Sequence, residues 1–158
     1  MERVANLASG FHLITKLLSK SVSQFMSDDK FELWESLKSN RAYQLAVELG
    51  EIVWQIVSKW DWLAKKTIGE QYIRSADSVS ANISEGWGKF TYKDKNNYFR
   101  TARGSLMETM NWTVKSERRG IIDQEKLQKL KIIFKTLPWE INKLTYYNNQ
   151  KSREKLIN

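Results

Sequence analysis

Apolar residues recur every three or four positions along four long segments of this chain, and this spacing is the strongest constraint on its fold. Side chains spaced in this way share one face of an α-helix. In the first segment they are Ala42, Leu45, Leu49, Ile52, Ile56, Trp60 and Leu63. One proline and seven glycines in 158 residues are too few to punctuate the many short strands of a sandwich or barrel. An all-α protein is therefore predicted.

The second segment begins with a capping-box pattern, in which Thr67 and Glu70 can each bond the other's free backbone N–H. Its apolar positions are Ile68, Tyr72, Ala76, Val79, Ile83 and Trp87. Gly86 and Gly88 permit the positive φ that often ends a helix. The chain is therefore expected to turn after them.

The last two helices carry clear end signals. Thr91 and Asp94 suit the start of the third helix, which is expected to end at Gly120 after two arginines. Asp123 is a natural N-cap for the fourth helix. Pro138 lies inside that helix and predicts a kink, because the apolar spacing resumes in phase beyond it.

Short connections between long helices make neighbouring helices antiparallel. The expected fold is an up-down-up-down antiparallel four-helix bundle over residues 37–150, with an N-terminal helical extension, residues 1–36, and a polar C-terminal tail, residues 151–158. Residues 11–25 have the pattern of one amphipathic helix. No stretch reaches the ~18 apolar residues of a membrane span, so no membrane partner is expected. The absence of cysteine is compatible with a cytoplasmic location, which we expect.

The first helix has a second apolar stripe, offset from the one that faces the core. Its members are Tyr43, Val47, Gly50, Trp54 and Val57. Soluble monomers seldom leave such a face in water. The favoured interpretation is a homo-oligomer interface at Tyr43, Val47, Trp54 and Val57, and the alternative is cover by residues 11–25.

Two sequence blocks are more distinctive than this periodicity. The first is Ile73-Arg-Ser-Ala-Asp-Ser-Val-Ser-Ala-Asn-Ile-Ser-Glu-Gly-Trp-Gly-Lys89, and the second is Phe99-Arg-Thr-Ala-Arg-Gly-Ser-Leu-Met-Glu108. In order and spacing they resemble the "four helix bundle protein" family, which was first noticed as reading frames within intervening sequences of bacterial large-subunit ribosomal RNA genes. The resemblance spans roughly residues 41–148 and implies the same bundle fold.

That family is similar in fold to the accessory variability determinant of diversity-generating retroelements. This second resemblance implies a homo-oligomer, in the form of a ring-shaped pentamer, with a basic surface that binds nucleic acid. It also implies a reverse transcriptase as partner.

The net charge of +8 lies entirely in the second part of the chain. Residues 1–92 hold 11 basic and 11 acidic side chains, whereas residues 93–158 hold 15 basic and 7 acidic ones. A basic field on one side attracts phosphate backbones. The predicted nucleic-acid-binding residues are Lys93, Lys95, Arg100, Arg103, Lys115, Arg118, Arg119, Lys126 and Lys129. The alternative for any single lysine is simply a solvated surface charge.

Four polar residues of the second and third helices are expected to form a structural network: Asn82, Glu85, Ser105 and Glu108. A metal or catalytic role for Glu85 and Glu108 is the alternative, but metal sites in bundles use Glu-x-x-His pairs, which this chain lacks. Its single histidine, His12, lies outside the predicted bundle, so a histidine-based catalytic site cannot be assembled there. We therefore expect no enzyme, no metal and no cofactor.

The function predicted from the sequence is a non-enzymatic, homo-oligomeric accessory protein that binds RNA or DNA. The alternative is a protein-interaction scaffold that does not bind nucleic acid. For Trp87 and Phe90, packing at the end of the bundle is the favoured interpretation, and stacking on bases is the alternative.

Overall fold

The computed structural model describes the backbone of residues 28–157 and the side chains of residues 30–155. The chain divides into two compact units, Met1–Ser36 and Leu37–Asn158. Every described element is helical, and the bounds are α2 Asp28–Ser39, α3 Arg41–Val57, α4 Trp62–Ala64, the π-helical η1 Lys65–Gly69, α5 Glu70–Gly88, α6 Tyr92–Arg118 and α7 Gln124–Ile157. The amphipathic helix predicted for residues 11–25 lies outside the described part.

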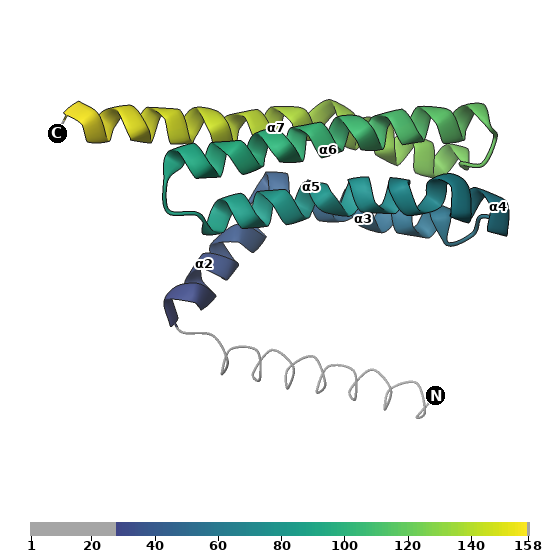
Figure 1. Cartoon of the computed structure of the whole chain (residues 1–158), viewed down its shortest axis with the longest axis horizontal. Coiled ribbons are helices and arrows are strands. Elements are labelled where there is room, and N and C mark those ends of the chain that lie inside the picture. Colours follow the sequence, from purple (N-terminus) through teal and green to yellow (C-terminus); the bar gives the residue numbers. More distant parts are fainter. Residues whose placement is uncertain (1–27, 158) are drawn as a thin grey trace, which may run out of the picture. The chain divides into compact units, whose positions relative to one another are not determined.

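Helices α3, α5, α6 and α7 form an antiparallel bundle (Figure 1). Each helix packs on the next along the chain, and α7 returns to pack on α3. The largest side chains fully buried between them include Leu49, Val53, Tyr72, Ile83, Phe99, Leu106, Leu130 and Ile141. Burying each apolar side chain of this size contributes about 1.5–3 kcal/mol to stability. The prediction of an all-α bundle is confirmed.

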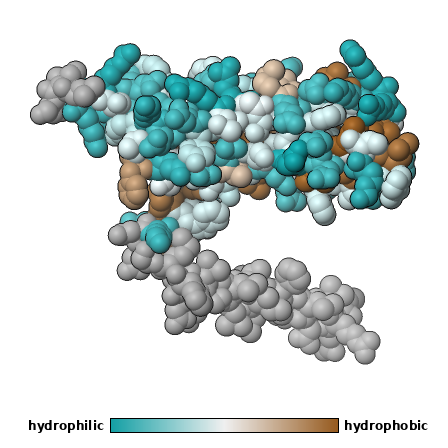
Figure 2. Space-filling model, in the orientation of Figure 1, coloured by the Kyte–Doolittle hydropathy of each residue, from teal (hydrophilic) through white to brown (hydrophobic). Residues whose placement is uncertain are grey.

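The first bundle helix is shorter than its apolar spacing suggested. Helix α3 ends at Val57, and the chain then turns so that the buried Trp60 donates its indole N–H to the Ile121 carbonyl at 2.6 Å. Leu63 is 63% exposed, so its assignment to the core was wrong. Figure 2 shows apolar residues gathered at the end of the molecule that carries α4.

The predicted capping box at Thr67 and Glu70 was also wrong. Asp61 is the N-cap here, because its carboxylate accepts the Ala64 N–H at 2.8 Å. The chain is therefore already helical at Thr67, whose hydroxyl donates to the Leu63 carbonyl at 2.7 Å instead of capping.

The ends of the last two helices follow the predicted signals. The Thr91 hydroxyl accepts the Asp94 N–H at 3.1 Å at the start of α6. Gly120 has a φ of +68°, and the N–H of Ile121 bonds back to the Ser116 carbonyl at 3.1 Å, as in a Schellman motif. Asp123 caps α7 through the Lys126 N–H at 2.8 Å. These capping predictions are confirmed.

Helix α7 is longer than expected. It continues without a break past Pro138 and extends to Ile157, so the tail predicted for residues 151–158 is helical through Ile157. Lys151 and Glu154 form an ion pair at 3.0 Å within this last part. No helix among residues 28–157 is long and apolar enough to cross a membrane.

Two buried polar pairs connect α5 to α6. The Tyr72 and Thr113 hydroxyls are hydrogen-bonded at 2.7 Å, and Thr109 donates to the Ser75 hydroxyl at 3.1 Å. Burial raises the pKa of Tyr72, so this hydroxyl stays protonated. Because buried polar groups are costly without partners, the pairs favour one register between the two helices.

Gly86 gives the first test of this packing. A Cβ added at Gly86 would lie 2.8 Å from Cε1 of Phe99 and 3.0 Å from Cβ of Tyr98. Gly86→Ala should therefore lower the free energy of unfolding by about 1–3 kcal/mol, measured by urea denaturation. Gly88→Ala is the matched control, because nothing lies within 4 Å of its added Cβ. Equal stability of the two variants would contradict this packing.

Candidate nucleic-acid interface

The outer face of α6 is exposed and combines basic, polar and apolar side chains. Two rows of residues at seven-residue intervals, about two helical turns, lie along it. They are Lys93, Arg100, Met107 and Val114 in one row and Asn97, Gly104, Asn111 and Arg118 in the other, and all eight are exposed. Neither row contains a carboxylate. We call these eight residues the α6 outer face.

Gly104 lies near the middle of the α6 outer face. Nothing lies within 4 Å of a Cβ added there, so no neighbour in the bundle requires a glycine. Glycine inside a helix is less stable than alanine by about 1 kcal/mol. The position therefore exposes bare helix backbone one residue after Arg103 and four residues after Arg100.

Five of the nine predicted nucleic-acid-binding residues gather on or beside this face. They are Lys93, Arg100, Arg103, Lys115 and Arg118. Within residues 30–155, none of the five takes part in a salt bridge. Arg100 donates to the Asn97 side chain at 3.2 Å, and the Lys115 ammonium lies 4.3 Å from the Trp112 ring centre. Their charges are not neutralised by carboxylates.

The other four predicted residues are placed differently. Lys129 is paired with Glu125 at 2.6 Å, and this hydrogen bond raises the pKa of Lys129 and lowers that of Glu125. Lys126 is hydrogen-bonded to the Gln55 side chain on α3. Lys95 lines a cavity at one end of the bundle, and Arg119 lies just beyond the end of α6. The nine residues therefore do not form one surface.

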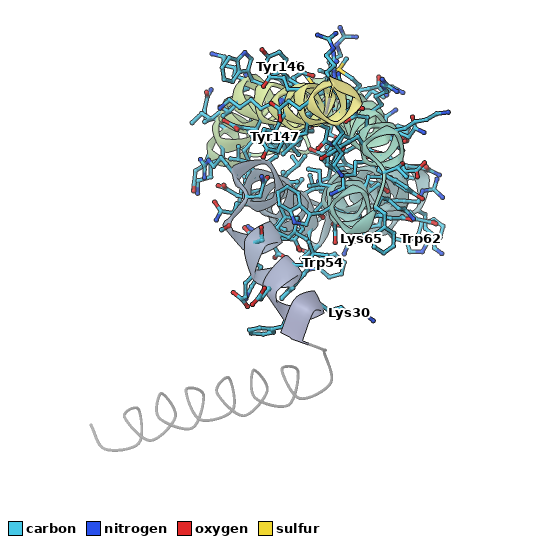
Figure 3. All side chains as sticks on the ribbon, turned by 90° about the vertical axis from the view of Figure 1, so that its left-hand side faces the viewer. Lys30, Trp54, Trp62, Lys65, Tyr146 and Tyr147 are labelled. Atoms are coloured by element: carbon cyan, nitrogen blue, oxygen red, sulfur yellow. The ribbon has the colours of Figure 1, made fainter. Side chains whose placement is uncertain are left out.

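Several lysines of α7 form ion pairs. Lys131 pairs with Glu117 of α6 at 3.5 Å, and Lys143 pairs with Glu140 at 2.9 Å. Its outward stripe is instead apolar and aromatic, with Ile132, Lys135, Trp139, Asn142 and Tyr146 all exposed. We call these five residues the α7 stripe, and Tyr146 is labelled in Figure 3.

The predicted interface on α3 is only partly exposed. Val47 is 39% and Trp54 57% exposed, and Trp54 points outward on the side of the bundle opposite Tyr146 (Figure 3). Tyr43 is half-buried. Val57 is 3% exposed and faces Gly69, where an added Cβ would lie 2.8 Å from its Cγ1. Its assignment to the interface was wrong.

Carboxylates flank this α3 surface. Glu51 on α3 and Asp77 on α5 are exposed, and a Cβ added at Gly50 would lie 2.7 Å from Asp77 Oδ1. Partial burial, followed by the nearby charge of Glu51, raises the pKa of Asp77. We call Val47, Glu51, Trp54 and Asp77 the α3 surface. It combines apolar side chains with negative charge.

The structure does not join the four residues of the predicted polar network. Asn82 donates to the Ser78 carbonyl at 2.7 Å, Glu85 pairs with Lys89 at 3.2 Å, and Glu108 accepts the Trp112 indole N–H at 3.3 Å. Ser105 is half-buried, and its backbone carbonyl accepts from Thr109. Asn82 and Glu108 find partners on their own helices, whereas Glu85 hydrogen-bonds with Tyr98 on α6 as well as with Lys89. Both carboxylates are exposed, so no charge is buried.

The buried network consists instead of Tyr72, Ser75, Thr109 and Thr113, which sequence reasoning missed. The signal that could have found it is a hydroxyl residue at each of two inward positions of α6. Among residues 30–155, no group of three potential metal ligands occurs.

The two aromatic residues near the α5–α6 turn differ in exposure. Phe90 is 101% exposed, so the packing predicted for it was wrong. Trp87 is half-buried and lines the same cavity as Lys95.

The comparison with protein families identifies the family of this chain. The model of the 23S rRNA-intervening sequence protein family matches residues 38–143, more than half of the chain. The chain belongs to this family. The match confirms the resemblance found through the two sequence blocks and covers α3 to the middle of α7. The comparison with curated proteins finds no match.

Gly104 allows a test of the α6 outer face as an open surface. Gly104→Ala in this family member should raise the free energy of unfolding by about 1 kcal/mol, because the added methyl meets no neighbour. Urea denaturation at fixed protein concentration measures this. A loss of stability would show that the backbone at Gly104 is covered.

Proposed function

We propose that this protein is a non-enzymatic nucleic-acid-binding bundle that binds phosphate backbones with the α6 outer face. The observation that carries the proposal is the set of cations without salt bridges on α6, with no carboxylate in either row. Such a surface attracts phosphates through a term that is independent of sequence and weakens with salt.

Gly104 supports the same proposal. A phosphate can approach a helix closely where no side chain projects, and Arg100 and Arg103 are near enough along the helix to bracket it. Arginine binds phosphate with two parallel N–H donors. Lys93 and Arg118 are separated along α6 by roughly 37 Å, about one turn of a duplex.

RNA is the first ligand to test, because the family name connects the family with 23S rRNA, although the name itself states no binding. Base specificity is expected to be weak, because phosphate contacts carry no direct sequence information. The reverse transcriptase implied by the resemblance to the accessory variability determinant, and the cytoplasmic location, stay predictions.

We further propose that copies of the chain associate head to tail. The α3 surface is apolar and acidic, whereas the α7 stripe is apolar and carries Lys135 without a carboxylate among its five residues. Two α3 surfaces would repel each other, but an α3 surface and an α7 stripe are complementary. Such heterologous contacts form rings when the rotation closes, as the predicted pentamer requires.

The nucleic-acid proposal is tested with two triple variants of equal charge change. Arg100→Ala/Arg103→Ala/Arg118→Ala removes cations of α6, and Lys129→Ala/Lys131→Ala/Lys143→Ala removes lysines that are already ion-paired. The α6 variant should lose about tenfold or more in affinity for single-stranded RNA. Its slope of log K against log salt should fall by about 2, at roughly 0.7 per phosphate contact. Fluorescence anisotropy over a salt series measures both.

The paired-lysine variant is expected to change affinity much less than the α6 variant. Equal losses would mean that net charge alone attracts the RNA. Absent binding by the unaltered protein at low salt would contradict the proposal and favour the alternative, a scaffold for protein partners. The Gly104→Ala variant, although more stable, should also bind RNA more weakly.

Head-to-tail association makes a distinctive prediction for Trp54→Glu and Trp139→Glu. Each variant alone should be monomeric, because one half of every contact is lost. Mixed together, they should form a heterodimer, since each keeps the surface that the other lacks. Light scattering after size-exclusion chromatography measures the masses. Normal assembly of either single variant would contradict a heterologous contact between these two surfaces.

A further inference from the structure

A cavity of about 370 Å³ opens at the end of the bundle where α3 begins, α5 ends and α6 begins, with α7 as its fourth wall. Residues that line it include Arg41, Trp87, Lys95, Phe99, Tyr147 and Asn148. Its volume is at the lower end of the ~300–1,000 Å³ typical of small-molecule sites. It suits a small molecule or a single residue of a polymer, but not a duplex.

The lining combines aromatic surface with positive charge. Trp87 is half-buried and Tyr147 is exposed, whereas Phe99 is buried. The Lys151 ammonium lies over the Tyr147 ring, 5.8 Å from its centre, so a ligand would meet the edge or the other face of this ring. Arg41 and Lys95 take part in no salt bridge within the described residues. Their charges remain available to an anion.

The remaining polar groups of the lining are largely engaged. Lys143 is paired with Glu140 at 2.9 Å. Asn40 uses its side-chain oxygen to cap α3 through the Ala42 N–H at 3.0 Å, and Asn148 donates to Asn96 at 3.1 Å. The cavity thus keeps two unpaired cations beside two accessible aromatic rings.

We propose that this cavity binds a single nucleotide, with its base against Trp87 and Tyr147 and its phosphate on Arg41 and Lys95. Base–aromatic stacking and charge-assisted hydrogen bonds to phosphate are the two interactions that the lining supplies. A free nucleoside monophosphate and the unpaired end of a strand present the same chemistry. The site is separate from the α6 outer face and does not depend on it.

The test uses isothermal titration of the full chain with AMP and UMP, and with a short RNA that carries or lacks a 5′-phosphate. Lys95→Ala and Arg41→Ala should each weaken binding about tenfold, the loss of one charge-assisted bond. Lys66→Ala is the control, since Lys66 is an exposed lysine outside both the cavity lining and the α6 outer face, and its loss should leave nucleotide affinity unchanged. Adenosine without phosphate should bind more weakly than AMP.

Tyr147→Ala probes the stacking with little risk to folding, because its side chain is exposed. It should weaken AMP binding while ribose 5-phosphate binding is unchanged. Dependence on Lys95 with the free nucleotides assigns the site to mononucleotides, and dependence only with the 5′-phosphorylated RNA assigns it to strand ends. Affinities that are insensitive to Lys95→Ala in both arms, or absent binding in both, would overturn the proposal.

The α6 triple variant separates this proposal from the previous one. It should lose affinity for long RNA yet keep its affinity for AMP, because its substitutions lie outside the cavity lining. Lys95→Ala should show the opposite pattern, with weaker binding of AMP and unchanged affinity for long RNA. Either proposal can therefore fail while the other stands.

Discussion

The close approach of α5 to α6 at Gly86 is the contact on which the rest of the bundle depends. The Phe99 ring occupies the space that a Cβ at Gly86 would fill. Further along the same interface, Ser75 and Ala76 are small and buried, so the helices stay close enough for Thr109 to reach Ser75. Apolar burial supplies most of the stabilisation, but it is non-directional. The close contact and the hydroxyl pairs determine which face of α6 is turned inward.

That orientation has a direct consequence for charge. With Phe99, Leu106 and Thr113 turned inward, residues at the opposite positions of a 27-residue helix must face water. Helix α7 contributes lysines as well, but carboxylates placed three or four residues away, or across on α6, neutralise several of them. Surface ion pairs of this kind contribute little stability. The five cations on or beside the α6 outer face take part in no such pair.

The sequence could predict the bundle and three of its helix ends, because both depend on local spacing and capping. It failed at Leu63 and Thr67, where the apolar spacing continues through a turn that exists because Trp60 reaches the Ile121 carbonyl. That contact joins residues far apart in the chain, so no local pattern contains it. The candidate site was only partly predictable for the same reason. Lysine counts locate the basic part of the chain, but whether Lys131 is paired depends on the register of α6 against α7.

The polar residues also show where prediction from the sequence fails. Glu85 and Glu108 were expected to share one network between helices. Instead Glu108 accepts from Trp112 on its own helix, and Glu85 pairs with Lys89 and hydrogen-bonds with Tyr98 of α6 at the exposed surface. A carboxylate that pairs locally keeps its hydration, whereas one buried between helices must recover a large desolvation penalty. Hydroxyls carry a much smaller penalty, so they occupy the interior. Gly104 is a different case. A glycine at this position lowers helix stability, and no neighbour in the molecule packs against it, so the packing of the bundle does not explain it. The proposed approach of a phosphate backbone to α6 would account for it.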